Sequence, residues 1–195
     1  TLFPYTTLFR SISQGRRAIV LVPEIALTHQ IINRLAGRFP NKVAVLHSGL
    51  TPGERYDQWW KINRGEYPIV VGSRSAIFSP QMDLGLIVID EEHEWTYKQI
   101  DPEPRYHTRD VAIKLAKLTG ATLVMGSASP DVDTRYRADS GLHKLLLLPE
   151  RILESTDGLT ESKNLAEVEI VDVKDELKQG HDHFLSRKLL KCLEE

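Results

Sequence analysis

Three carboxylates and a histidine end an apolar run, LIVIDEEH (86–93). The run shows no alternation of polar and apolar residues, which indicates a strand buried on both faces, as in a parallel sheet covered by helices. In such sheets, ligands bind beyond the carboxyl ends of the strands. Asp90 could hold a hydrated Mg²⁺ while Glu91 orients a water molecule, the pairing that hydrolysis of a nucleotide phosphate needs. A solvated acidic turn is the structural alternative.

The same acidic string could instead bind a catalytic transition metal. Residues 90–94 read DEEHE, and His107 is the next histidine along the chain. Catalytic zinc sites typically use two or three histidines at a defined spacing, such as H-E-x-x-H, and EEHEW (91–95) lacks the second. A metal-dependent hydrolase therefore stands as an alternative that the spacing does not favour.

Strands alternate with helices along the chain. The spacing of apolar residues predicts helices at 26–39, 51–65 and 110–118, the second with a capping box between Thr51 and Glu54. Such alternation predicts an α/β fold with a parallel sheet and right-handed crossovers. The strands are expected at 18–22, 43–47, 69–73, 86–90, 122–127 and 144–148.

Composition limits the possible function. The chain has 195 residues, of which 41% are hydrophobic and 27% charged, so it can bury one full core and begin a second. The net charge of −2 provides no general basic field, so nucleic acid would need a local patch. The single cysteine, Cys192, excludes an internal disulfide and favours the cytoplasm. No apolar run reaches the roughly 18–20 residues of a membrane span, so no membrane partner is expected.

Other polar segments also follow predicted strands. They are LVPEIALT (21–28), HSGL (47–50), VGSRSAIF (71–78) and GSASP (126–130). With DEEH, and in this order, they resemble the motifs of the first RecA-like motor lobe of superfamily-two helicases, most of all the replication-restart DNA helicases. The resemblance covers about residues 18–149 and implies a RecA-like parallel sheet covered by helices, followed by the start of a second lobe.

The resemblance also implies roles for the site residues. Asp90 would coordinate Mg²⁺ through water, and Glu91 would polarise the water that attacks the γ-phosphate of ATP. His93 would couple the nucleotide site to the rest of the lobe. Ser127 and Ser129, the latter at a position where such helicases more often carry threonine, could hydrogen-bond the DEEH carboxylates. A surface histidine and an ordinary serine-glycine turn are the structural alternatives.

Contacts with DNA are expected at the other strand ends. There, backbone amides, hydroxyls and a guanidinium could bind phosphate. Two simpler explanations stay open: Pro23 can merely end a strand, and Arg74 can pair with an acid. The residues expected to contact DNA are Pro23, Glu24, Ser48, Gly49, Ser73 and Arg74.

The segment 95–109 interleaves aromatic and basic residues. This pattern suits stacking on unpaired bases beside a phosphate track. By resemblance, it is the aromatic-rich loop that links DNA binding to ATP hydrolysis. The alternative is a hydrophobic brace that packs the loop onto the lobe. Its candidate DNA-binding residues are Trp95, Tyr97, Lys98, Arg105, Tyr106 and Arg109.

The expected organisation is that of a partial motor. Residues 1–11 repeat TLF and resemble the translated read-through of a sequencing adapter, with a disordered or weakly β-forming leader as the alternative. Residues 12–149 would form the first lobe without its P-loop strand, because no G-x-x-x-x-G-K-[ST] occurs in the chain. Residues 150–166 would form a linker, and 167–195 the start of the second lobe.

The implied parent protein is an ATP-dependent DNA helicase. It would bind forked and single-stranded DNA, use ATP and Mg²⁺, and restart stalled forks together with replication-restart proteins. Zn²⁺ would be bound only by a part of the parent beyond residue 195. By itself the chain is expected to be inactive, because its sequence lacks the P-loop whose lysine and backbone amides cradle the phosphates. The alternative is a non-catalytic lobe that binds nucleic acid.

Overall fold

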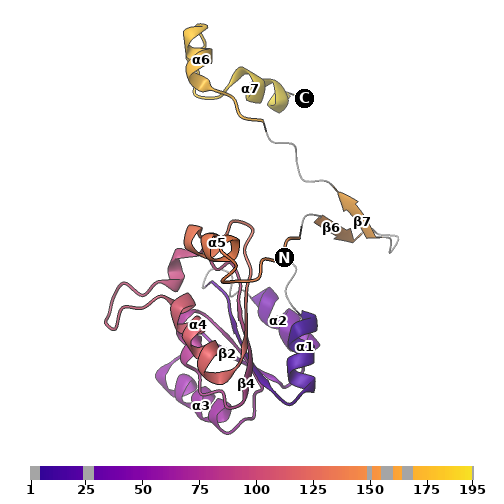
Figure 1. Cartoon of the computed structure of the whole chain (residues 1–195), viewed down its shortest axis with the longest axis vertical. Coiled ribbons are helices and arrows are strands. Elements are labelled where there is room, and N and C mark those ends of the chain that lie inside the picture. The colour runs from indigo at the N-terminus through magenta and orange to yellow at the C-terminus, as the bar shows by residue number, and fades with distance from the viewer. Residues whose placement is uncertain (1–4, 24–28, 149–150, 155–159, 164–168, 195) are drawn as a thin grey trace. The chain divides into compact units, whose positions relative to one another are not determined.

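The computed structural model describes residues 5–23, 29–148, 151–154, 160–163 and 169–194 (Figure 1). The chain divides into two compact units, Thr1–Lys144 and Leu145–Glu195, and each is described by itself. The predicted end of the first lobe, residue 149, lies close to this division.

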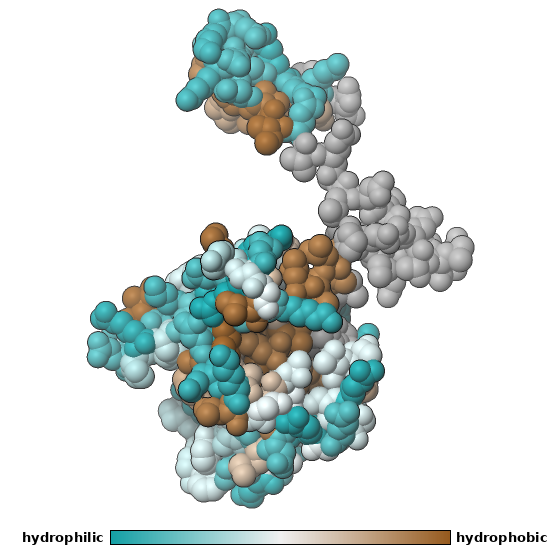
Figure 2. Space-filling model, viewed as in Figure 1, coloured by the Kyte–Doolittle hydropathy of each residue, from teal (hydrophilic) through white to brown (hydrophobic). Residues whose placement is uncertain are grey.

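A parallel sheet of five strands forms the first unit, in the order β2-β3-β1-β4-β5. This arrangement confirms the predicted α/β class. Apart from Arg17 at the start of β1, the central strands contain no polar side chain, because both faces of the sheet are covered, whereas the edge strand β5 is only partly buried. Figure 2 shows apolar side chains near the middle of this unit, surrounded by polar ones. The strands are β1 (Arg17–Leu21), β2 (Val43–Leu46), β3 (Ile69–Gly72), β4 (Leu84–Ile89) and β5 (Thr122–Met125).

Helices cover both faces of the sheet. Ile62 of α3 and Ala112 of α4 pack into the core on one face, and Leu8 of α1 and Leu35 of α2 pack into the core on the other. Neighbouring residues of each strand point to opposite faces, so both cores draw on the same strands. The first unit contains α1 (Tyr5–Ser13), α2 (His29–Arg38), α3 (Pro52–Asn63), η2 (Arg74–Phe78), η3 (Trp95–Tyr97), α4 (Thr108–Thr119) and α5 (Val132–Asp139).

Local sequence signals account for several helix ends. Thr51 and Glu54 form the predicted capping box of α3, with Pro52 at the first position. Gly120 ends α4 with a φ of 67°, a left-handed conformation that costs glycine little. Residues 26–28 of the predicted helix 26–39 lie outside the described residues, and α2 covers its remainder up to Arg38.

Residues 5–11, expected to belong to a leader, form the first turns of α1. The Leu8 side chain is fully buried in the core. This helix differs from the disordered or β-forming alternative, and the non-native origin of residues 1–11 stays a prediction.

The predicted strand at 144–148 is wrong. No strand forms there, and the side chains of Leu146, Leu147 and Leu148 are more than 70% exposed (73%, 71% and 72%). A strand needs a hydrogen-bonded neighbour, and β5 ends the five-stranded sheet. An apolar run alone therefore overpredicted a strand here.

The described residues of the second unit form two short strands and two short helices. β6 (Arg151–Glu154) pairs with β7 (Thr160–Lys163) in antiparallel fashion, within the predicted linker 150–166. α6 (Val173–Lys178) and α7 (Arg187–Glu194) follow. Among the described residues, no helix is long and apolar enough to cross a membrane.

Candidate nucleotide and nucleic-acid site

The carboxyl ends of the five strands are in register. Leu46 is paired with Gly72, Gly72 with Leu21, Leu21 with Ile89, and Ile89 with Met125. The segments that follow these residues therefore share one edge of the sheet, as the sequence predicts for the candidate motifs. A Cβ atom on Gly72 would collide with Leu46 O and with Ala76 Cβ, so glycine permits the close approach of β2 and η2.

The DEEH and GSASP segments lie side by side at this edge. The amide of Asp90 continues the sheet by donating to Leu21 O at 2.9 Å. The amide of Gly126 donates to Ile89 O at 2.9 Å, and the amide of Glu92 donates to Gly126 O at 3.0 Å. These backbone bonds fix one segment relative to the other.

Asp90 is a half-buried carboxylate beside a second acid. Burial raises its pKa above the usual value, and the charge of Glu91 raises it further. A nearby cation would relieve both effects, so this environment fits a ligand of Mg²⁺. Among the described residues, no three His, Cys, Asp or Glu side chains come together as a metal site. A single carboxylate, completed by water and phosphate oxygens, is a common way to hold Mg²⁺ with a nucleotide.

The backbone at Glu91 is left-handed, with a φ of 46°. For a residue other than glycine, such a conformation costs about 1–3 kcal/mol and persists only where its surroundings hold it. The amide of Glu94 donates to Glu91 O at 2.9 Å, which closes the turn. The Glu91 carboxylate stays about one-third exposed and lies 3.6 Å from His93 Nδ1. The candidate water-orienting group is thus accessible but carried on strained backbone.

His93 joins the DEEH segment to the GSASP segment. Its Nδ1 lies 2.6 Å from Ser127 Oγ, and the amide of Ser129 donates to the same oxygen at 3.0 Å. The expectation that Ser127 bonds a DEEH carboxylate needs correction, because its observed partner in DEEH is the imidazole. Ser129 contributes its backbone amide to this link.

Glu92, which the sequence suggested only as a metal ligand of the alternative hydrolase, is the buried member of the string. Its side chain is 1% exposed and accepts hydrogen bonds from Arg109, Thr134 and the amide of Asp131. Burial lowers the pKa of Arg109, yet the hydrogen bond that Arg109 donates to Glu92 and the charge of Asp131 outweigh this effect and raise the pKa. No spacing rule distinguishes Glu92 from its acidic neighbours.

Tyr97 and Arg109 are anchors of the segment 95–109. Tyr97 is 1% exposed, and its hydroxyl donates to Asp90 O at 2.8 Å. Burial raises the pKa of this hydroxyl, which therefore stays protonated as a donor. Thr108 Oγ1 donates to Tyr97 O at 3.0 Å. Tyr97 and Arg109 were both candidates for DNA contact, and their burial instead favours the brace interpretation at these two positions.

Arg74 also holds this segment. Its Nη1 donates to Thr96 O at 3.2 Å and to Lys98 O at 3.0 Å. Ser73 is buried, and its amide donates to Leu46 O at 3.3 Å. The Arg74 guanidinium, expected to bind phosphate or to pair with an acid, therefore donates hydrogen bonds to backbone carbonyls.

The other candidates at the strand ends differ in exposure. Pro23 is buried, whereas Ser48 and Gly49 are exposed in the turn after β2. Glu24 lies outside the described residues. Only part of the predicted DNA track at this edge is therefore open to a ligand in this structure.

Residues 98–107 form a projecting loop within the segment 95–109, visible just before α4 in Figure 1. Lys98 and His107 form an antiparallel bridge at its base, where the amide of Gln99 donates to Tyr106 O at 2.8 Å. Residues 100–105 are exposed, including Arg105, and Trp95 is 72% exposed. Tyr106 packs edge-on against Phe78, with 5.1 Å between the ring centroids. The loop thus offers aromatic and basic side chains to a ligand.

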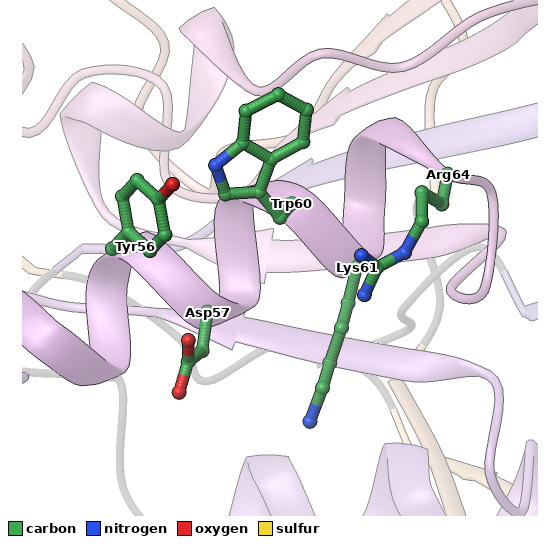
Figure 3. A pocket seen from close by; sticks show the side chains of 5 residues that line it. All are labelled: Tyr56, Asp57, Trp60, Lys61 and Arg64. Atoms are coloured by element: carbon green, nitrogen blue, oxygen red, sulfur yellow. The ribbon is translucent and has the colours of Figure 1, made fainter.

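A shallow pocket of about 390 Å³ on α3 also combines aromatic and basic residues (Figure 3). The rings of Trp60 and Tyr56 meet edge-on, with 6.1 Å between their centroids, and Arg64 Nε lies 2.9 Å from Glu66 Oε1. The pocket contains none of the predicted site residues. It is lined by Tyr56, Asp57, Trp60, Lys61 and Arg64.

Comparison with known proteins places the chain in a family. Residues 1–138 match the family model described as DEAD/DEAH box helicase. The chain belongs to the DEAD/DEAH box helicase family. It is 47% identical over 184 residues to the replication restart protein PriA of Bacillus subtilis (strain 168), a match that covers 94% of the chain.

Two further relatives carry the same name. The chain is 44% identical over 189 residues to replication restart protein PriA of Synechocystis sp., and 38% identical over 182 residues to that of Chlamydia trachomatis serovar D. The matches cover 94% and 93% of the chain. The chain spans only 22–23% of the length of these three relatives.

Proposed function

We propose that the chain is part of the first motor lobe of an ATP-dependent DNA helicase that restarts replication at stalled forks. The observation that carries this proposal is the edge of the sheet where Asp90, Glu91 and the His93–Ser127 link converge. The three relatives named replication restart protein support the biological context.

In this proposal the acidic string performs three tasks. Asp90 holds Mg²⁺ through water, and Glu91 accepts a hydrogen bond from the attacking water and directs it toward the γ-phosphate. Mg²⁺, when bound with ATP, neutralises charge on the phosphate oxygens. The contact of His93 with Ser127, 2.6 Å long, links this region to the turn before α5. A change at the nucleotide would thereby reach a second segment of the lobe.

DNA contact is assigned to the exposed part of the segment 95–109. Trp95 and Tyr106 offer aromatic surface, and Lys98 and Arg105 offer charge, which suits single-stranded DNA. Ser48 and Gly49 extend the candidate track to the end of β2.

The longer protein would have further requirements. It would use ATP and Mg²⁺, act in the cytoplasm on forked and single-stranded DNA, and cooperate with other replication-restart proteins. Zn²⁺ would be bound by another part of that protein.

A direct test compares two preparations. A protein of the relatives' length that contains this chain should show DNA-stimulated phosphate release and unwind a forked duplex. The 195-residue chain alone should show negligible phosphate release, because its sequence contains no P-loop motif. Absence of DNA-stimulated hydrolysis in the longer protein would refute the proposed function.

DNA binding without turnover is the second candidate for the chain alone, favoured by the same missing motif. Fluorescence anisotropy with a labelled single-stranded oligonucleotide decides it. Saturable binding that weakens with added salt supports this candidate, and no binding at low salt removes it.

A further inference from the structure

Glu92 differs from the other acids of the DEEH string because its carboxylate is directed into the protein. The residue is 2% exposed, whereas Asp90 and Glu91 are only half-buried. A buried carboxylate requires partners for both oxygens. Its partners therefore indicate what this side chain does.

Glu92 joins three separate parts of the lobe. One oxygen, Oε1, accepts from the amide of Asp131 at 2.8 Å, at the N-cap of α5. The other, Oε2, accepts from Arg109 Nη1 at 3.0 Å and from Thr134 Oγ1 at 2.9 Å. Arg109 lies in the first turn of α4 and Thr134 in the first turn of α5. Through one side chain, the turn after β4 is tied to both helices.

Thr134 is the central hydroxyl of this network. Its Oγ1 accepts from Arg109 Nη1 at 2.8 Å and donates to Glu92 Oε2, so the single hydroxyl proton is used. Arg109 also lies 3.4 Å from Asp131 Oδ1. Buried ion pairs of this kind contribute little net stability compared with apolar packing, because both charges must be desolvated. A positional role explains the arrangement better than stability does.

The residue that this network adjoins is the strained one. Glu91, at a φ of 46°, lies between two fixed neighbours. On one side, Asp90 O accepts from the Tyr97 hydroxyl at 2.8 Å. On the other side, the Glu92 amide donates to Gly126 O at 3.0 Å and its side chain is locked by the network. Fixing both neighbours is what holds a left-handed residue in place.

We infer that Glu92 is a positioning residue for the hydrolysis proposed here. Through Arg109 and Thr134, its carboxylate holds Glu91 in the left-handed conformation that presents the water-orienting carboxylate. The same contacts tie this turn to Arg109, at the end of the aromatic and basic segment 95–109. Glu92 itself need not touch the nucleotide. This inference rests on the proposed function.

Thr134→Val tests the network with little change in volume. Valine keeps the shape but removes the hydroxyl between Glu92 and Arg109, and Thr134→Ser restores it. In a protein of the relatives' length, we expect Thr134→Val to lower kcat for ATP hydrolysis roughly tenfold or more, because small displacements of a reacting group are costly. The KM for ATP should change little, since the lost positioning acts in the transition state. Thr134→Ser should recover most of the rate.

Thr119→Val is the matched control. Thr119 is in the last turn of α4, and its hydroxyl donates to Leu115 O at 2.8 Å, away from the acidic string. This variant loses a threonine hydroxyl of similar kind and should keep the normal kcat. A Thr134→Val enzyme with unchanged kcat would overturn the inference. So would equal losses in the valine and serine variants, or a kcat that falls only together with the melting temperature.

Amide exchange in the 195-residue chain tests the network without any activity. Glu92→Gln weakens the acceptor of the Asp131 amide, and release of the turn should expose the Glu94 amide that closes it on Glu91 O. Both amides should therefore exchange faster than in the unaltered chain, while amides of β1 keep their protection. Unchanged exchange of the Glu94 amide would refute the positioning of Glu91. If the longer protein shows no DNA-stimulated hydrolysis, the proposed function fails, and this measurement decides the positional role alone.

Discussion

The segment 95–109 contains buried and exposed residues of the same kinds. Tyr97 and Arg109 are buried and hydrogen-bonded, whereas Trp95 and Arg105 are exposed. Aromatic and basic composition therefore does not by itself identify a DNA contact. Burial separates the residues that hold the acidic string in place from those that remain available to a ligand.

This comparison predicts two kinds of consequence for mutations. Changes among the buried residues should alter the stability of the lobe or the rate at the acidic string. Changes in the projecting loop should alter affinity for DNA and leave folding unaffected.

Glu91→Gln should have the largest effect on activity. In a protein of the relatives' length, hydrolysis should fall by about two to four orders of magnitude, the usual span for a positioned acid–base group. Glutamine keeps the size of the side chain, so ATP binding should be nearly retained. Single-turnover phosphate release and nucleotide titration measure the two effects separately. A normal rate would show that DEEH is not the catalytic string.

Tyr97→Ala should have the largest effect on stability. Removing a fully buried aromatic ring should lower the free energy of unfolding by about 3–5 kcal/mol. Tyr97→Phe removes only the hydrogen bond to Asp90 O and should cost about 1–2 kcal/mol. Urea unfolding of the 195-residue chain, followed by circular dichroism, measures both losses. Equal and small losses would mean that Tyr97 is not the anchor assigned here.

Parts of this division were accessible from sequence. Apolar runs predict the parallel strands, and their ends predict that Asp90 and Ser127 share one edge. The inward direction of Glu92 was not predictable, because it depends on Arg109 and Thr134, which approach from two different helices. Leu145–Leu148 shows the opposite error, since local hydrophobicity predicts a strand but cannot supply its neighbour. Short-range patterns thus indicated the shared edge of the sheet, and long-range contacts decided which side chains of the candidate site are buried there.

Trp95→Ala should weaken DNA binding without destabilising the lobe. The loss should be about 1–3 kcal/mol if the indole stacks on one base. Arg105→Ala should reduce the salt dependence of binding by about one phosphate contact. Titrations of single-stranded DNA at several salt concentrations measure both in a protein of the relatives' length.

The matched control for Trp95→Ala is Trp60→Ala. Trp60 is also a surface tryptophan beside basic residues, in the α3 pocket of Figure 3. It lies outside the candidate site, so its loss should leave DNA affinity unchanged. Equal effects at Trp60 and Trp95 would contradict the assignment of DNA contact to the exposed part of the segment 95–109.

The smallest expected effect concerns the charge of Asp90 in the absence of Mg²⁺. An unfolded aspartate ionises near its usual pKa of 3.8, and burial together with the charge of Glu91 raises the pKa in the folded lobe. The folded state therefore binds this proton more tightly. The free energy of unfolding falls as the pH rises from about 3.8 through the folded pKa, and this loss of stability persists at neutral pH.

Asp90→Asn lacks this loss of stability, because asparagine carries no charge. Because solvent screens a partly exposed side chain, we expect the variant to be more stable at pH 7 by only about 0.5 kcal/mol or less, and to match the wild type near pH 3. Urea unfolding at both pH values measures the difference. A variant that is less stable than the wild type at pH 7 would show that the Asp90 charge is already compensated within the lobe, and would weaken its assignment as the Mg²⁺ ligand.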